Sequence, residues 1–374
     1  MANKITDEML KEDLANGMSV SKLAEKYKVS MRQVSRRKAN LISHGWSPEH
    51  DMTKECPEGF NVKGVSTLYD KQGQVAAQWV KTKQDYKQKY DGIKNTLSAW
   101  TEEMPSIEEI KLTKTKYQDN LAVYPLGDPH VGMASWDDIS SINWDIKKAK
   151  KHFCKIFDRV VKSSPSCKEA LIVNLGDFFH YDNLAGVTSR AGNVLDRDGL
   201  YYHMIEAGIT IIRCMIETAL RHHKKVSVIN AIGNHDDVSS MMLALALSQI
   251  YDKQPRLNII KSGKVFEYYK YGEVLLGVHH GHTCKMKDLP SVMAVDKPKE
   301  WGNASHRYWL TGHIHHDSMI ETGGCKVESF RTVAPADQYA FSHGYRSGRD
   351  TKCIVYDKLH GEIERHTINV SQIA

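Results

Sequence analysis

Short apolar stretches alternate with longer amphipathic ones along the middle of this chain. LAVYPL at 121–126, ALIVNL at 170–175 and VSVINAI at 226–232 are rich in β-branched and aliphatic residues, as in strands buried on both faces of a sheet. A later run, VFEYYKYGEVLLGVHHGH, predicts a hairpin that ends in histidines, and 308–368 is mostly strand-like. Helical spacing of apolar residues recurs near 145–163, 200–223 and 238–251. The pattern predicts an α/β fold with two sheets and helices outside them.

The first 46 residues carry the signals of three short helices instead. Thr6, Ser19 and Ser30 are the expected N-caps, and Gly17 ends the first helix. Val34, Leu41 and Ile42 are expected to face inward, and Arg32, Arg36, Arg37 and Lys38 outward. Two short helices about a tight turn, the second one basic, are typical of a helix-turn-helix, in which a helix enters the major groove and its cations neutralise phosphates. The alternative is a small bundle with a solvated basic face that contacts a partner.

The segment between these two parts shows little chemistry. Residues 64–69 and 74–81 predict two strands about a Gly-containing turn, and the polar stretch 84–103 predicts a helix. We therefore expect three parts: a helix-turn-helix domain at 1–46, a hairpin and helical linker at 47–117, and an α/β domain at 118–374.

Composition and charge narrow the class of protein. The 374 residues are 41% hydrophobic and 26% charged, which is typical of a globular protein. No apolar run approaches the ~18 residues that span a bilayer, and the N-terminus lacks a secretory pattern, so we expect a cytoplasmic protein without membrane contact. Seven scattered cysteines without a CxxC indicate free thiols. The net charge is +6, to which residues 1–46 contribute +4, and this permits a nucleic-acid partner.

Five Gly-containing motifs interrupt the α/β part, and the first four each follow an apolar strand-like run. They are Gly127-Asp128-Pro129-His130, Gly176-Asp177-Phe178-Phe179-His180, Gly233-Asn234-His235-Asp236, His279-His280-Gly281-His282 and Gly312-His313-Ile314-His315-His316. One such motif is also an ordinary turn signal, and any single histidine is as well explained as a loop cap. Five in this order, at strand ends where α/β sheets place their sites, indicate one shared site.

The donor types in these motifs predict a metal centre. Carboxylate, amide and imidazole groups without a thiolate suit manganese, iron or zinc and not a cysteine-based structural site. The donors are too many for one ion, whereas two ions ~3.5–4 Å apart would use them all and could clamp an in-line phosphoryl displacement. We expect a pair of divalent ions, with manganese favoured over iron, zinc and magnesium.

On these motifs, residues 118–320 resemble the calcineurin-like metallophosphoesterases. The resemblance implies a four-layer α/β/β/α sandwich with a binuclear centre in the domain 118–374. It implies that His235 is a non-ligand histidine that stabilises the transition state or protonates the leaving oxygen. His280 is preferred to His279 as a ligand because the family pattern has a histidine directly before Gly-His. The implied ligands are Asp128, His130, Asp177 and His315 for the first ion, with Asp177 bridging, and Asn234, His280 and His313 for the second.

The second motif distinguishes branches of this family. It lacks the second Asp and the Arg-Gly of the protein phosphatases, and it resembles the SbcD-type DNA-repair nucleases, in which the corresponding histidine lies near the substrate phosphate. This implies a catalytic role for His180, with a structural loop cap as the alternative. We also expect Arg190, in the polar loop 185–200, and His282 to bind substrate, although an ordinary surface loop is nearly as well supported. Tyr201, Tyr202 and Trp309 could stack on bases, but core packing is favoured for each.

Together these inferences predict a metal-dependent phosphodiesterase that hydrolyses DNA by attack of a metal-bound hydroxide, as an exonuclease or an endonuclease. DNA is the expected partner. One alternative is a phosphodiesterase or phosphatase for a small nucleotide or another phosphoester, and the other is a DNA-binding regulator with an inactive core. An ATPase partner is not expected, because the extra domain is N-terminal, and a homo-oligomer stays open. The order of the parts also resembles some phage-encoded phosphoesterases.

Overall fold

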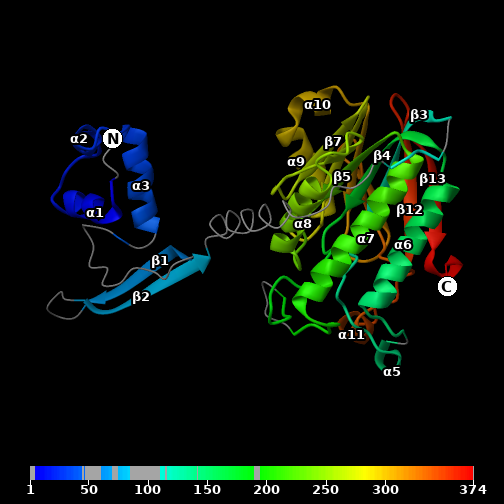
Figure 1. Cartoon of the computed structure of the whole chain (residues 1–374), viewed down its shortest axis with the longest axis horizontal. Coiled ribbons are helices and arrows are strands. Elements are labelled where there is room, and N and C mark those ends of the chain that lie inside the picture. The colour runs from blue at the N-terminus through cyan, green and yellow to red at the C-terminus, as the bar shows by residue number, and fades with distance from the viewer. Residues whose placement is uncertain are drawn as a thin grey trace. The chain divides into compact units, whose positions relative to one another are not determined.

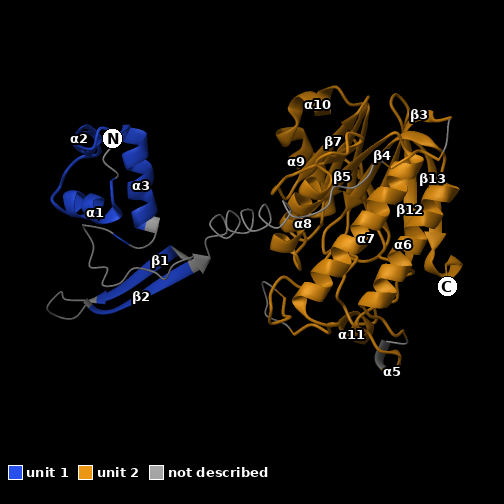
Figure 2. Ribbon diagram, viewed as in Figure 1, with its two compact units in different colours: residues 1–95 blue, residues 96–374 orange. Residues whose placement is uncertain are grey.

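The described residues of the protein form two compact units, 1–95 and 96–374 (Figure 2). The structure is a computed structural model, and it describes residues 5–43, 46, 60–69, 75–84, 110–113, 116–140, 142–188 and 194–373. The domain boundaries expected at 46 and 117 stay predictions.

Unit 1 contains the three expected N-terminal helices, α1 (Asp7–Ala15), α2 (Val20–Lys26) and α3 (Met31–Ser43). The hydroxyls of Thr6, Ser19 and Ser30 accept hydrogen bonds from backbone N–H groups three residues onward, which satisfies donors that a helix start leaves unpaired. The helices share a small apolar core of Leu10, Leu14, Leu23, Val34 and Leu41. The caps and the apolar spacing therefore explain this unit.

Three of the side-chain orientations expected in unit 1 differ in the structure, those of Ile42, Arg37 and Lys38, of which Lys38 is half-buried. Ile42, expected to face inward, is 48% exposed, because the core is already closed by Val34 and Leu41. Arg37, expected to face outward, is half-buried, donates a hydrogen bond to the Ile5 carbonyl and lies 3.6 Å from the Asp7 carboxylate. Its guanidinium therefore joins α3 to the start of the chain.

The expected hairpin of unit 1 is also present. Strands β1 (Phe60–Tyr69) and β2 (Val75–Gln84) pair antiparallel. Of the helix expected at 84–103, Gln84 is the last residue of β2, and residues 85–103 lie outside the described part of the chain.

Unit 2 is built on two sheets. The six-stranded sheet has the order β13-β12-β3-β4-β5-β6, and its four strands β3 to β6 run parallel. The five-stranded sheet has the order β10-β11-β9-β8-β7. The strands of the first sheet are β3 (Gln118–Leu126), β4 (Cys167–Asn174), β5 (Lys225–Asn230), β6 (Leu257–Ile259), β12 (Asp350–Asp357) and β13 (Gly361–Asn369). Those of the second are β7 (Glu267–Tyr271), β8 (Val274–His279), β9 (His306–Thr311), β10 (Ser318–Thr322) and β11 (Cys325–Ser329).

Three apolar clusters place these sheets inside a four-layer sandwich. Leu121 and Val123 pack toward Leu276 and Val278 of the other sheet, so the two sheets share one core. Tyr124 and its neighbours pack instead with helices α6 (Ile146–Ser163), α7 (Tyr201–His222) and α8 (Asp237–Ile250), the first two of which lie side by side in Figure 1. Beyond the five-stranded sheet, α9 (Leu289–Asp296) packs on Trp309, and α10 (Pro298–Gly302) follows. The expected α/β/β/α architecture is therefore confirmed.

The helices α9 and α10 had no counterpart in the sequence prediction, and neither did two short helices in loops, α5 (Asp137–Ser140) and α11 (Gln338–Ser342). Two single 3₁₀ turns, Met286–Asp288 and Val370–Gln372, complete the described elements. Among the described residues, no helix combines the length and the apolar character needed to cross a bilayer.

Close packing of α7 against the second motif gives a stability prediction. A Cβ atom on Gly208 would lie 2.2 Å from Cε1 of Phe179 and 3.0 Å from Cε1 of Phe178. Gly208→Ala should gain ~1 kcal/mol of helix propensity but lose more through overpacking, for a net loss of about 1–2 kcal/mol in the free energy of unfolding. Urea denaturation measures this change. Gly302→Ala is the matched control, because no atom lies within 4 Å of its Cβ, and it should be neutral or stabilising. A Gly208→Ala protein as stable as the wild type would contradict this packing.

Candidate metal centre

The five motifs meet at one end of the two sheets. Asp128 and His130 follow β3, Asp177 follows β4, and Asn234 follows β5, all at carboxyl ends of parallel strands. In the second sheet, His280 follows β8, and His313 and His315 follow β9, which pairs parallel with β8. Since parallel strands end at the same edge of a sheet, side chains far apart in sequence reach one site.

Asp128, His130 and His315 form the first donor cluster. Nε2 of His130 lies 3.2 Å from Nε2 of His315, which is 3.3 Å from Oδ1 of Asp128. Asp128 and His130 are buried, and His315 is partly exposed. These are three of the four ligands that the resemblance implies for the first ion, and the fourth, Asp177, lies in the second cluster.

Asp177, His280 and His313 form the second donor cluster. Nε2 of His280 lies 3.0 Å from Oδ2 of Asp177 and 3.1 Å from Oδ1 of Asn234. Its other ring nitrogen, Nδ1, donates to the Leu175 carbonyl at 2.8 Å, because a carbonyl can only accept. The Nε2 lone pair therefore faces two oxygens, an arrangement that needs a cation among the three atoms.

The pKa shifts of His280 and Asp177 also indicate that this cluster needs a cation. Although burial acts the other way, the Asp177 carboxylate raises the pKa of His280 to about 10. Burial tends to raise the pKa of Asp177, yet the charge of His280 holds that pKa well below its usual value. A proton on His280 supplies the cation that a bound metal would otherwise supply.

The donor set fits divalent metal ions. Ligand atoms that bind one ion at ~2.1 Å lie roughly 3 Å from each other. The separations of His315 from His130 and Asp128, and of His280 from Asp177 and Asn234, are 3.0–3.3 Å. The hydrogen bond from His280 Nδ1 to a carbonyl is the usual support of a metal-binding imidazole. The two clusters also adjoin. The backbone N–H of His313 donates to the Asp128 carboxylate at 3.0 Å, and Nδ1 of His280 lies 3.8 Å from the same carboxylate. His/Asp clusters of this kind can hold divalent metal, and the number and identity of the ions stay predictions.

The backbone of this centre is held in a conformation that non-glycine residues rarely adopt. A left-handed φ costs such a residue on the order of 1 kcal/mol and persists only where the surroundings impose it, which is most common at functional sites. Five of the seven expected ligands have it: Asp128 (φ 42°), His130 (44°), Asp177 (50°), His313 (73°) and His315 (56°). The fold therefore imposes these conformations in order to point the donors inward.

Asp236, which has no role among the residues expected from the sequence, supports the centre from beneath. Its buried carboxylate accepts the backbone N–H groups of Asp177, Phe179 and Gly233 at 3.0–3.2 Å, and the Ser240 hydroxyl at 2.7 Å. Burial, with a further contribution from Asp177, raises the pKa of Asp236 to about 6. Asp236 thus joins the loop of Asp177 to the loop of Asn234. Its place at the end of the Gly-Asn-His-Asp motif was the available signal.

Glycine is required where these two loops meet. A Cβ atom on Gly233 would lie 2.1 Å from Oδ1 of Asp177 and 2.8 Å from Oδ1 of Asp236. Any side chain there would displace the carboxylate that the resemblance names as the bridge between the ions.

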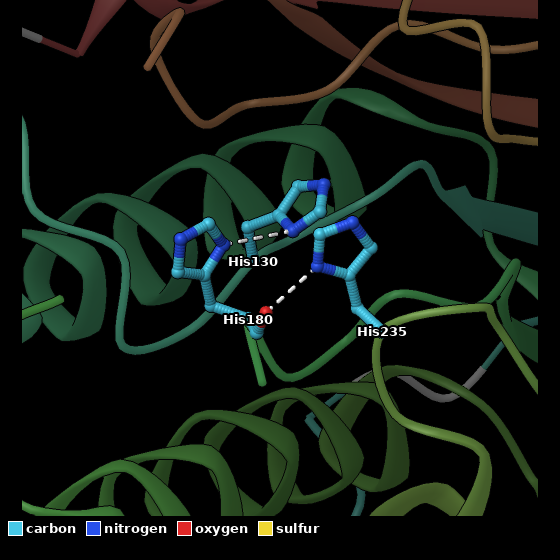
Figure 3. A group of neighbouring side chains, drawn as sticks. All are labelled: His130, His180 and His235. Atoms are coloured by element: carbon cyan, nitrogen blue, oxygen red, sulfur yellow. Dashed lines mark hydrogen bonds between the residues drawn. The ribbon is translucent and has the colours of Figure 1, made fainter. Parts of the chain in front are cut away.

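Three histidines stand next to each other at one side of the first cluster (Figure 3). His235 Nδ1 donates to the His180 carbonyl at 2.8 Å, so in the neutral ring Nε2 carries no proton. His180 is 1% exposed, and its Nδ1 lies 3.2 Å from Nδ1 of His130. Burial, with His235 acting in the same direction, lowers the pKa of His180 to about 3. A neutral His180 can accept a hydrogen bond from Nδ1 of His130, which leaves Nε2 of His130 available to a metal. This favours a positioning role for His180. The expected catalytic roles of His235 and His180 stay predictions.

A partly buried ionic network anchors the loop of the fifth motif. Lys352 on β12 contacts Asp317 at 2.8 Å and Asp350 at 2.9 Å, and Arg331 lies 3.4 Å and 2.9 Å from the same two carboxylates. Asp317 comes two residues after His315. Since Lys352 is 7% exposed, its charge depends on these partners, and the loop is fixed to the six-stranded sheet.

The remaining expected site residues lie in different places. His279 stacks on Phe266 at 4.7 Å, outside the donor clusters, whereas the His282 ring lies 5.3 Å from that of His280. Trp309 is fully buried, so it cannot stack on a base, and Tyr201 is half-buried with its hydroxyl on Ser239. Tyr202 is 62% exposed. Arg190 lies outside the described residues.

Comparisons with known proteins add structural similarity only. No protein-family model and no curated protein matches the sequence. A predicted phosphoesterase from Streptococcus pneumoniae TIGR4 is 10% identical, covers 68% of this chain and 92% of its own, and has a TM-score of 0.29. An archaeal phosphodiesterase is 14% identical, covers 66% of this chain and 99% of its own, and has a TM-score of 0.32. Zinc-complexed Vps29 from Entamoeba histolytica is 12% identical, covers 67% of this chain and 99% of its own, and has a TM-score of 0.27. Similarity this weak transfers neither a substrate nor an activity to this chain.

The position of Asp236 predicts an effect on metal affinity. Asp236→Asn places an N–H₂ group against backbone N–H donors, so the loops of Asp177 and Asn234 should separate and Mn²⁺ affinity should fall ~10–100-fold. Isothermal titration calorimetry measures this change. Asp182→Asn is the matched control: Asp182 accepts the Val238 and Ser239 N–H groups at the start of α8 and contacts no ligand. It should lower stability and leave metal affinity within about twofold. Equal losses of metal affinity in the two variants would contradict the role given to Asp236.

Proposed function

We propose that this protein is a phosphodiesterase that uses two divalent metal ions to hydrolyse DNA. The observation that supports it best is the contact between the two donor clusters, in which Asp128 of the first receives the His313 N–H and lies beside His280 of the second. Two adjoining sets of oxygen and imidazole donors suit a pair of ions and have no comparable use in a structural site. Oxygen and imidazole donors without a thiolate suit manganese, iron, zinc or magnesium, and of these we propose manganese.

The chemistry divides between the ions and the chain. Two bound ions would supply Lewis acidity to the phosphoryl oxygens and would lower the pKa of a water molecule. The chain orients the donors through Asp236 and through the left-handed backbone of its ligand loops. His235 contributes its Nε2, which can hold a proton at the rim of the centre while its Nδ1 is fixed on the His180 carbonyl. A proton held there can be passed to the leaving oxygen.

DNA is proposed as the substrate because of unit 1. Helices α2 and α3 are joined by a four-residue turn, residues 27–30, in which Lys28 has a φ of 53°. Arg32 and Arg36 are exposed on α3, while Val34 between them is buried in the core. A basic helix presented in this way suits the major groove. The resemblance of Gly-Asp-Phe-Phe-His to the SbcD-type nucleases supports the same substrate.

A cleavage assay tests the proposed activity. With Mn²⁺, the wild type should degrade linear duplex or circular single-stranded DNA and also hydrolyse bis-p-nitrophenyl phosphate. Asp177→Ala should reduce both rates more than about 100-fold, because it removes a donor from the second cluster. His316→Ala is the control, since this exposed histidine is the immediate neighbour of His315 but belongs to neither cluster. Hydrolysis of the small ester without DNA cleavage would overturn the nuclease and favour a small nucleotide substrate.

The role of α3 gives a separate prediction. Replacing Arg32 and Arg36 with alanine should weaken duplex binding and lower the slope of log K against log salt by about 1.8, since each phosphate contact contributes ~0.9. Fluorescence anisotropy across a salt series measures both quantities. Arg37→Ala should mainly reduce the stability of unit 1, because its guanidinium is bound to the Ile5 carbonyl. An unchanged slope in the double variant would show that this face of α3 does not contact phosphates.

A further inference from the structure

Three rings stand close together on the surface at α11. Tyr339 and His343 are one helical turn apart, with ring centroids 4.1 Å from each other and planes at 33°. The Tyr345 ring follows at 6.1 Å from His343, with an angle of 31°. Tyr339 is 63% exposed and Tyr345 57%, so core packing does not explain them. His343 Nδ1 hydrogen-bonds the Tyr339 carbonyl at 2.8 Å, which holds the middle ring in place.

A cation accompanies these rings. The Arg346 guanidinium lies 3.9 Å from the centroid of the Phe341 ring and donates to the carbonyls of Phe341 and Tyr345 at 2.9 and 3.1 Å. It is therefore fixed beside the rings and exposed. Aromatic faces with an adjacent arginine are the combination that proteins use to bind single-stranded nucleic acid, because every base has a face to stack and every linkage carries a negative charge.

The segment that leads into α11 (labelled in Figure 1) starts beside Asp128. Thr332 donates from its hydroxyl to the Asp128 carbonyl at 2.7 Å. Four residues later the Ala336 carbonyl accepts from the Ser135 hydroxyl at 3.3 Å, in the loop that follows His130. Asp337 then caps α11 through the Ala340 N–H.

From these observations we propose that Tyr339, His343, Tyr345 and Arg346 form a stacking platform that binds unpaired bases of single-stranded DNA. The proposal rests on the proposed function, in which a phosphodiester of the same strand reaches the metal centre. Within a duplex, the face of each internal base is covered by its neighbours. The stacking platform therefore accepts single strands and frayed ends, and it would select them over intact duplex.

Binding of short oligonucleotides to the full-length protein tests the stacking platform. The probe is a fluorescein-labelled hexathymidylate with phosphorothioate linkages, which slow cleavage, and the readout is anisotropy with Mn²⁺ present. Replacing Tyr339 and Tyr345 together with alanine should raise Kd about tenfold or more, the effect of removing stacking partners. Replacing both with phenylalanine should restore wild-type affinity, because the rings remain. Leu359→Ala, which removes a 60% exposed side chain at the turn between β12 and β13, should have no effect.

Further ligands separate stacking from charge. An abasic hexamer keeps the backbone but lacks bases, so it should bind wild type as weakly as hexathymidylate binds the alanine variant. Hexauridylate should also bind the alanine variant about tenfold more weakly than wild type, because the rings contact base faces and not the sugar. If the alanine variant lost affinity for hexauridylate but not for hexathymidylate, the assignment to DNA would be overturned. The stacking platform is also overturned if wild type does not bind hexathymidylate, if the alanine variant binds it unchanged, or if wild type binds the abasic hexamer as tightly. Any contribution from unit 1 is constant, since all variants carry it.

Hydrolysis of bis-p-nitrophenyl phosphate distinguishes failure of this proposal from failure of the proposed function. The alanine variant should hydrolyse this small ester at the wild-type rate, since the ester needs no stacking partner. Normal ester hydrolysis with unchanged oligonucleotide binding would overturn the stacking platform and leave the metal centre intact. If the alanine variant lost oligonucleotide affinity and neither it nor the wild type hydrolysed the ester, the stacking platform would be supported and the proposed phosphodiesterase activity overturned.

Discussion

The close approach of buried carboxylate and imidazole groups at the carboxyl ends of the strands is the constraint on which the rest of unit 2 depends. Two buried carboxylates and several imidazoles face one another at roughly 3 Å, and Nε2 of His280 has an oxygen of Asp177 on one side and of Asn234 on the other. Without a cation such an arrangement would be strongly unfavourable, because the buried charges have lost their hydration. The fold must therefore hold the donors together against their own repulsion and desolvation.

Several features of the molecule serve this purpose. The parallel strands bring the motifs to one edge, and left-handed backbone conformations turn the donors inward. Asp236 collects the backbone N–H groups of two ligand loops, and Lys352 with Asp317 and Asp350 fixes a third loop to the six-stranded sheet. Asp236, Asp350 and Lys352 are buried polar groups, and their partners are supplied only by the assembled site. The geometry of the centre and the stability of the surrounding loops are consequently the same set of contacts.

The surroundings of the centre differ on its two sides. Toward the protein interior, His180 and His130 contact each other in a buried environment that keeps His180 neutral, which suits orientation of a ligand more than contact with substrate. Toward solvent, His313 is exposed, and the segment from Thr332, which contacts Asp128, leads to α11 with the exposed Tyr339. A metal centre alone acts on phosphorus and says little about the leaving group. The donor clusters by themselves therefore do not identify a substrate.

The sequence by itself determined two sheets with helices outside them, the caps of the first three helices and the motifs that carry the candidate donors, because apolar periodicity, capping residues and Gly-containing motifs act over neighbouring positions. The order of the four layers was implied by the family resemblance. Only the tertiary structure decided which donors meet: His130 and His315 are 185 positions apart, and no local pattern encodes their 3.2 Å contact. It likewise decided that Asp236 supports two loops and that Arg37 turns back to the start of the chain. The physical reason is that burial and hydrogen-bond partners are properties of the assembled packing, to which distant segments contribute together.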